Sequence, residues 1–80
     1  MRNGIAVVMA RNLIGLSQVE LAASTKLSQG TMRKLELGKA ISDKSLAKVL
    51  GWLDERVVFT YRGSEIVSVG DKKMVKICFK

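Results

Sequence analysis

The chain has 80 residues, a length that fits one domain with a small core. Its 14 lysine and arginine residues outnumber 7 aspartate and glutamate residues, and the net charge of +7 favours a polyanionic partner, nucleic acid before an anionic membrane. No apolar run reaches the roughly 18–20 residues of a membrane span, and the N-terminal residues do not resemble a signal peptide. We therefore expect a cytoplasmic protein.

The residue inventory argues against catalysis. The chain lacks histidine, which is the usual general base near neutral pH and the commonest metal ligand. Its one cysteine, Cys78, lies in an apolar run and fits a packed thiol in a reducing compartment better than a redox or metal site. The seven glycines show no phosphate-loop spacing. We expect neither an enzyme nor a bound metal or cofactor.

The first predicted helix spans about Gly4 to Ile14. Asn3 is a favourable N-cap residue, and Gly15 is placed to end the helix in a left-handed conformation. Helical spacing predicts that the larger apolar side chains of this segment face the core. These side chains are Ile5, Val8, Met9 and Leu13.

Two short helices follow, each opened by a hydroxyl side chain. Ser17 and Glu20 match the S-x-x-E capping box of a helix that runs to about Ser24. Ser28 then caps a third helix, predicted over Gln29–Leu37, with a glycine after it as the stop signal. The side chains expected to face inward are Leu21, Ala22, Met32 and Leu35.

A fourth helix is predicted to begin after Ser42 or Asp43 and to reach about Trp52 or Leu53. Its apolar stripe consists of Leu46, Val49, Leu50 and Leu53. From residue 56 onward, apolar and polar residues alternate as in β-strands, at 56–62, 65–69 and 74–79, with turn signals at Gly63–Ser64 and Gly70–Asp71.

The expected fold class is α+β, with a helical part at residues 1–53 and a β-rich extension at 54–80, forming one domain. The extension carries more apolar side chains than one sheet face can bury, so we expect a second copy of the chain to cover the other face. The alternative that these strands fold over the helices of their own chain stays open. The residues expected at the dimer interface are Val57, Phe59, Tyr61, Val75, Ile77 and Phe79.

The segment from Leu16 to Lys39 carries the functional signal. Two short helices joined by about three residues predict a helix-turn-helix, whose second helix enters the major groove of DNA. That helix needs small or polar groups in its first turn and a polar or basic outer face. Gln29, Gly30 and Thr31 meet the first requirement, and Arg33 and Lys34 meet the second.

These residues resemble the lambda-repressor-like helix-turn-helix family of the Cro/CI or XRE type. The family motif reads roughly L-[ST]-Q-x-E-L-A, some six residues, then S-x-x-T-[IV]-x-x-[IL]-E-x-G, and about ten positions of this chain match it without a gap. The resemblance covers about Ile5 to Leu53. It implies a domain of four or five helices, followed here by an antiparallel hairpin or a three-strand meander.

The resemblance also implies roles for individual residues. Gln18 falls at a position that bonds a DNA phosphate, and Gln29 falls at the first base-reading position. Arg11 and Glu36 match an ion pair that ties the first helix to the end of the third. The residues expected at DNA are Gln18, Ser28, Gln29, Gly30, Thr31, Arg33, Lys34 and Lys39.

Two departures from the family pattern stand out. The turn between the two short helices has Lys26 where the family usually has glycine, so Lys26 must adopt a left-handed conformation at a cost of about 1 kcal/mol, or the turn must differ. Gly30 replaces a larger polar residue, so one base contact can be missing.

The function expected from these observations is sequence-specific DNA binding by a homodimeric repressor on an inverted-repeat operator. The main alternative is an antitoxin that binds both its own operator and a toxin. Two simpler readings stay open: nucleic-acid or membrane binding by bulk charge, and Arg33 and Lys34 as ordinary surface charges. Eight basic and three acidic residues give the helical part +5, which is most of the excess charge.

Overall fold

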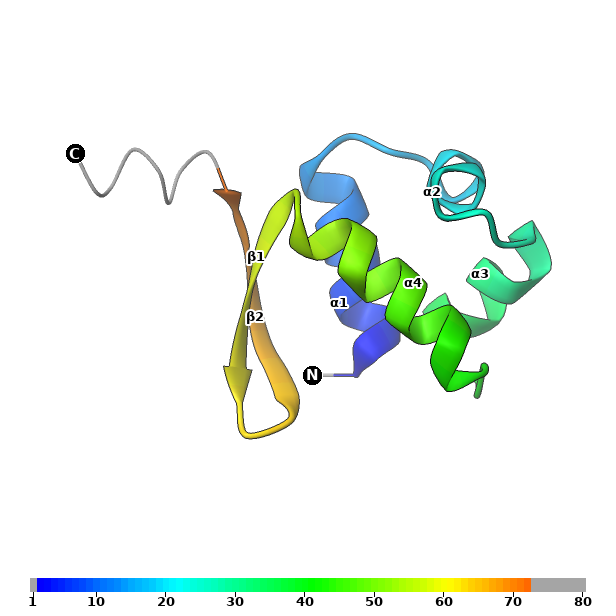
Figure 1. The fold of residues 1–80 in the computed structure, drawn as a ribbon. Helices are drawn as coiled ribbons and strands as arrows, with labels where there is room; N and C mark the ends of the chain where they lie inside the picture. The colour runs from blue at the N-terminus through cyan, green and yellow to red at the C-terminus, as the bar shows by residue number, and fades with distance from the viewer. Residues whose placement is uncertain (1, 73–80) are drawn as a thin grey trace.

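The computed structural model describes residues 2–72. Within that range, four helices precede a two-stranded antiparallel hairpin, which confirms the α+β fold class (Figure 1). The predicted third strand, Cys78 and the proposed interface residues Val75, Ile77 and Phe79 lie outside the described residues. The elements are α1 (Asn3–Leu13), α2 (Gln18–Thr25), α3 (Gln29–Glu36), α4 (Asp43–Asp54), β1 (Val57–Arg62) and β2 (Glu65–Asp71).

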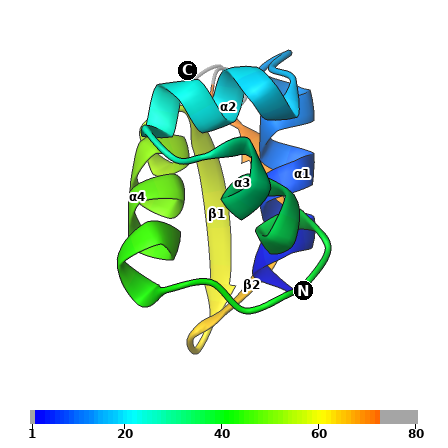
Figure 2. The same ribbon diagram turned by 90° about the vertical axis from the view of Figure 1, so that its right-hand side faces the viewer.

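The elements stack in layers. The helices α2 and α3 lie on one side of the molecule, α1 and α4 lie in the middle, and the hairpin covers the opposite side (Figures 1 and 2). The strand β2 contacts α1, and β1 contacts α4. One apolar core runs through these layers, and it includes Val7 of α1, Leu21 of α2, Met32 of α3 and Val49 of α4. The hairpin is therefore part of the same folded body as the helices.

Side-chain caps fix where the short helices begin. At the start of α2, the Ser17 hydroxyl accepts a hydrogen bond from the Glu20 N–H at 3.1 Å, and the Glu20 carboxylate accepts one from the Ser17 N–H at 3.0 Å. This confirms the predicted capping box, and the bond from Ser17 lowers the pKa of Glu20. The hydroxyls of Ser28 and Ser42 also cap α3 and α4, where they accept the Thr31 and Ser45 N–H groups without a reciprocal carboxylate bond. The prediction of Asn3 as a cap is wrong, because α1 already begins at Asn3 and has no side-chain cap.

Three helices end in a left-handed residue. Gly15 and Gly38, both predicted as stops, have φ values of +76° and +83° after α1 and α3. The third such residue is Lys26, with φ 59° and ψ 35°, at the end of α2. The turn after it is closed by a bond of 3.0 Å from the Leu27 N–H to the Ala22 carbonyl. Of the two possibilities for this turn, the structure has the left-handed lysine.

The buried face of α1 differs from the prediction. Gly4, Ala6, Val7 and Ala10 are buried, whereas Ile5, Met9 and Leu13 are exposed. The physical reason is the close approach of α1 to α3: a Cβ at Gly4 would collide with the backbone carbonyl oxygen of Leu35. The absence of a side chain at Gly4 permits that approach, while the larger side chains of Ile5, Met9 and Leu13 stay exposed.

The hairpin extends further than predicted. Gly70 and Asp71 do not form a turn; they continue β2 and pair with Val58 and Val57 of β1. The register shifts once, between Thr60 and Tyr61, so the strand alternation is interrupted there. At the end of β2, the Lys72 ammonium donates to the Asp54 and Glu55 carbonyl oxygens at 3.2 and 3.1 Å and ties the hairpin to the end of α4.

The prediction that Val57 and Phe59 form a dimer interface is wrong for this structure. Both side chains are buried within the single chain, in the core that also contains Ile66 of β2. The alternation was read correctly, since the two residues do share a face, but the helices of the same chain cover that face. Tyr61, the third described member of the set, is exposed.

No single helix within residues 2–72 is long and apolar enough to cross a membrane. Only α1 and α2 together satisfy the length and composition of a span, and the chain bends by 102° between them.

The left-handed lysine generates a stability prediction. Replacing Lys26→Gly should raise the free energy of unfolding by about 1 kcal/mol, because glycine adopts this conformation without a Cβ clash. Urea or thermal unfolding measures the change. Lys26→Ala is the matched control, since it removes the same charge but keeps the Cβ, and it should give no comparable gain. Equal stability of the two variants would contradict the prediction.

Candidate nucleic-acid interface

The helix α3 has one face in the core and one face in solvent. Met32 and Leu35 are buried, and they hold the helix against the rest of the domain. Figure 2 shows α3 on the surface of the molecule, on the side away from the hairpin. The residues exposed along α3 and at its end are Gln29, Gly30, Arg33, Lys34 and Leu37. Half of the eight residues predicted to contact DNA are therefore exposed on this one helix.

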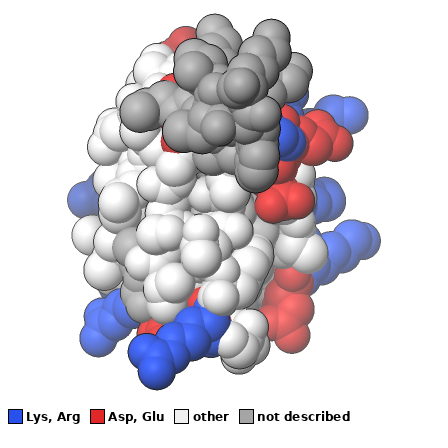
Figure 3. All heavy atoms as spheres, turned by 90° about the vertical axis from the view of Figure 1, so that its left-hand side faces the viewer, with Lys and Arg blue, Asp and Glu red and all other residues white. Residues whose placement is uncertain are grey.

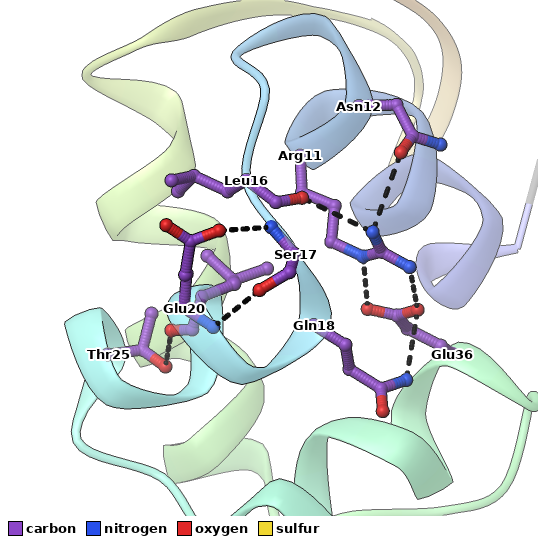
Figure 4. A network of polar contacts seen from close by, with 9 residues as sticks. Arg11, Asn12, Leu16, Ser17, Gln18, Glu20, Thr25 and Glu36 are labelled. Atoms are coloured by element: carbon purple, nitrogen blue, oxygen red, sulfur yellow. Dashed lines mark hydrogen bonds and ion pairs between the residues drawn. The ribbon is translucent and has the colours of Figure 1, made fainter.

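A polar network joins α3 to the two preceding helices (Figure 4). The Arg11 guanidinium of α1 donates to the Glu36 carboxylate through Nε at 2.8 Å and through Nη2 at 2.9 Å. The amide of Gln18, the first residue of α2, donates to the same carboxylate at 3.2 Å. Arg11 also donates to the Leu16 carbonyl at 3.3 Å. One carboxylate thus fixes the end of α3 relative to both α1 and the start of α2.

The Arg11–Glu36 ion pair that the family resemblance implies is present in the structure. The side chains retain 18% and 7% exposure, so the Glu36 charge is almost removed from solvent. The hydrogen bond to Glu36 raises the pKa of Arg11, which keeps the guanidinium charged. The only acidic side chain of α3 is therefore neutralised and turned away from the exposed face, where it would repel a phosphate.

Not all predicted contact residues are equally free. The Ser28 hydroxyl accepts the Thr31 N–H at 3.1 Å and also lies 2.8 Å from the Thr31 hydroxyl. Thr31 is half-buried. These two side chains are engaged with each other at the start of α3, and Gln18 is engaged with Glu36. In the structure the groups with open access are those of Gln29, Arg33, Lys34 and Lys39.

Basic groups continue beyond α3. Lys39 is exposed directly after the helix, where its N–H donates to the Lys34 carbonyl at 2.8 Å. Lys39 lines a groove together with Arg2 and the start of α1. The Arg2 guanidinium lies beside Gly38. Arg2 could not be predicted to belong here, because only the folded chain brings residue 2 next to residue 38.

Leu37 is a second exposed residue near this surface that was not predicted. Leu37 is 62% exposed and lies on the outward side of α3, one residue past its end. The spacing gives a signal that was available: residue 37 follows Gly30 by seven positions, close to two helical turns, so the two share a face.

Within residues 2–72, no three histidine, cysteine or acidic side chains gather to form a metal site.

Neither a family model nor a curated protein matches this sequence.

The Arg11–Glu36 pair generates the second prediction. Glu36→Ala should lower the free energy of unfolding by about 3 kcal/mol, because it leaves the largely buried Arg11 charge without its partner. Arg33→Ala, on the exposed side of the same helix, is the control and should change stability by no more than about 0.5 kcal/mol. Urea unfolding compares the two variants. Matching midpoints and slopes would show that the pair adds nothing to stability.

Proposed function

We propose that this chain is a sequence-specific DNA-binding regulator with a lambda-repressor-like helix-turn-helix, in which α3 reads the major groove. The observation that supports the proposal most directly is the exposed face of α3, which presents Gln29, Arg33 and Lys34 while its one carboxylate is paired with Arg11. A helix about 10–12 Å across fits a major groove about 12 Å wide.

The exposed side chains suit different parts of a duplex. The amide of Gln29 both donates and accepts, as the major-groove edge of adenine requires. Arg33 and Lys34 provide positive charge for guanine edges or phosphates, and Lys39 lies beyond the helix, where the backbone would pass. The network of Arg11, Glu36 and Gln18 supplies the rigidity that base reading needs, because it fixes α3 from two sides.

The proposed regulator is a homodimeric cytoplasmic repressor on an inverted repeat. A two-fold pair would place two copies of α3 about 34 Å apart, one turn of DNA. The hairpin lies on the side opposite to α3, so a contact made there would leave α3 free (Figures 1 and 2).

An antitoxin is the second candidate, and one observation favours a protein partner. The hairpin side of the molecule shows a broad area without charge, and apolar side chains of both the hairpin and α1 are exposed (Figure 3). Both candidates bind an operator and can be dimers, so a neighbouring gene for a kinase-like or nuclease toxin is the observation that would distinguish the antitoxin. The exposed apolar residues are Ile5, Met9, Leu13, Tyr61 and Val67.

Base reading by Gln29 is testable with DNA selected by the chain from a random duplex library. Gln29→Ala should weaken binding to the selected site by about 1–3 kcal/mol and change binding to unrelated DNA little, because a bidentate amide contact discriminates between bases. Fluorescence anisotropy at fixed salt measures both affinities. An equal loss on the two DNAs would remove Gln29 from the base-reading set.

Phosphate contact by Lys39 predicts a change in salt dependence. Lys39→Ala should weaken binding to all sequences alike and reduce the log–log slope of affinity against salt by about 0.9, the value for one phosphate contact. Arg62→Ala is the matched control: it removes one positive charge from the hairpin, on the side away from α3, and should leave the slope unchanged. An effect of Lys39→Ala confined to one base position would contradict the phosphate role.

A further inference from the structure

Gly30 has no role within the described protein. A Cβ at this position would meet only the Ser28 hydroxyl oxygen, 4.0 Å away. Gly30 does not have the positive φ that Gly15 and Gly38 have, and it makes no close contact of the kind found at Gly4. Glycine inside a helix is less stable than alanine by about 0.5–1 kcal/mol. The fold therefore gains nothing from this glycine and loses some helix stability.

Gly30 lies on the side of α3 opposite to its buried face. At about 100° per residue, Gly30 lies about 160° from Met32 and about 140° from Leu35, which point into the core. Exposed side chains surround it: Gln29 precedes it, and Arg33 and Lys34 follow one turn later. The outward face of α3 thus has a gap at Gly30 in its first turn, next to longer polar and basic groups.

We propose that this gap receives the C5-methyl group of a thymine in the major groove. The inference rests on the proposed function and specifies one base of the recognised site. Gly30 presents only a CH₂ group outward, with no side-chain donor or acceptor. A polar base edge at this place would lose water without gaining a hydrogen bond, whereas the thymine methyl is the one apolar group that base pairs expose in the major groove.

The neighbours of the gap fit this assignment. At about 100° per residue, the exposed Gln29 and Arg33 lie on one side of Gly30 and the exposed Lys34 lies on the other, so their polar groups can bond the edges of adjacent base pairs. With no Cβ at position 30, the helix backbone can approach the base that lies between them. Thymine contact then arises from shape, and the polar side chains read the bases next to it.

The experiment adds a methyl group to the protein and removes one from the DNA. The site is selected by the full chain from a random duplex library, and each thymine of that site is replaced in turn by deoxyuridine, which keeps the base pairing. For the unmodified chain, one replacement in each half-site should weaken binding about fourfold, which corresponds to about 0.8 kcal/mol for one buried methyl group.

Gly30→Ala places its methyl group in the same gap. This variant should bind the thymine site about tenfold more weakly than the unmodified chain, and it should bind the site with that one deoxyuridine more tightly than the thymine site. Gly51→Ala is the matched control, because Gly51 is a second glycine in a helix whose Cβ would meet nothing within 4 Å, and it lies on α4. Both variants should melt at a higher temperature than the unmodified chain, and Gly51→Ala should bind every site as the unmodified chain does.

The outcomes separate this inference from the function on which it rests. If the chain enriches no sequence, both are overturned. If it enriches a site that Gly30→Ala binds as tightly as before, or if the loss caused by Gly30→Ala is the same with every thymine and every deoxyuridine, only the thymine assignment is overturned. The higher melting temperature of both variants excludes misfolding as the cause of weaker binding.

Discussion

The two-point contact between the Arg11 guanidinium and the Glu36 carboxylate determines where α3 lies. It joins the middle of the molecule to the end of the exposed helix, and the Gln18 amide adds α2 to the same carboxylate. An ion pair with little access to solvent is sensitive to geometry, because each charge needs its partner to compensate for lost hydration. Arg11 and Gln18, which do not belong to the outward face of α3, therefore fix the orientation of that face.

Small residues of α1 form part of the core. Gly4 allows α1 to approach α3 at the level of the backbone, and the hairpin covers the other side of the α1–α4 layer. A domain of this size has few buried side chains, so close packing of small residues and a well-satisfied polar network must both contribute. In the described part of the chain, no buried side-chain nitrogen or oxygen atom lacks a hydrogen-bond partner.

Local signals in the sequence predicted local structure. The caps at Ser17 and Ser28 and the stops at Gly15 and Gly38 depend on hydrogen bonds within a few residues, and the structure has them. The phase of α1 was missed because the burial of small residues depends on how near another helix comes, which apolar spacing does not report.

For the sheet and the candidate site too, the sequence predicted local features but not the contacts between distant segments. Alternation placed Val57 and Phe59 on one face of the sheet. It did not determine whether a second copy or the helices of the same chain cover that face. Periodicity located the outward residues of α3, and the resemblance supplied the partner of Arg11, whereas the closeness of Arg2 to the loop after α3 required the folded chain. DNA as the ligand of this face stays a prediction.

The contact between α1 and β2 has a consequence for the order in which the protein forms during synthesis. A ribosome releases the N-terminal helix first, yet the core beside that helix is closed by Ile66 and other residues of a strand made some fifty residues later. The helices emerging early have no cover for the hairpin side of α1 and α4 until that strand leaves the exit tunnel. Contacts between segments so distant in sequence form slowly compared with helix turns, so we expect the core to be completed only after the hairpin has been translated.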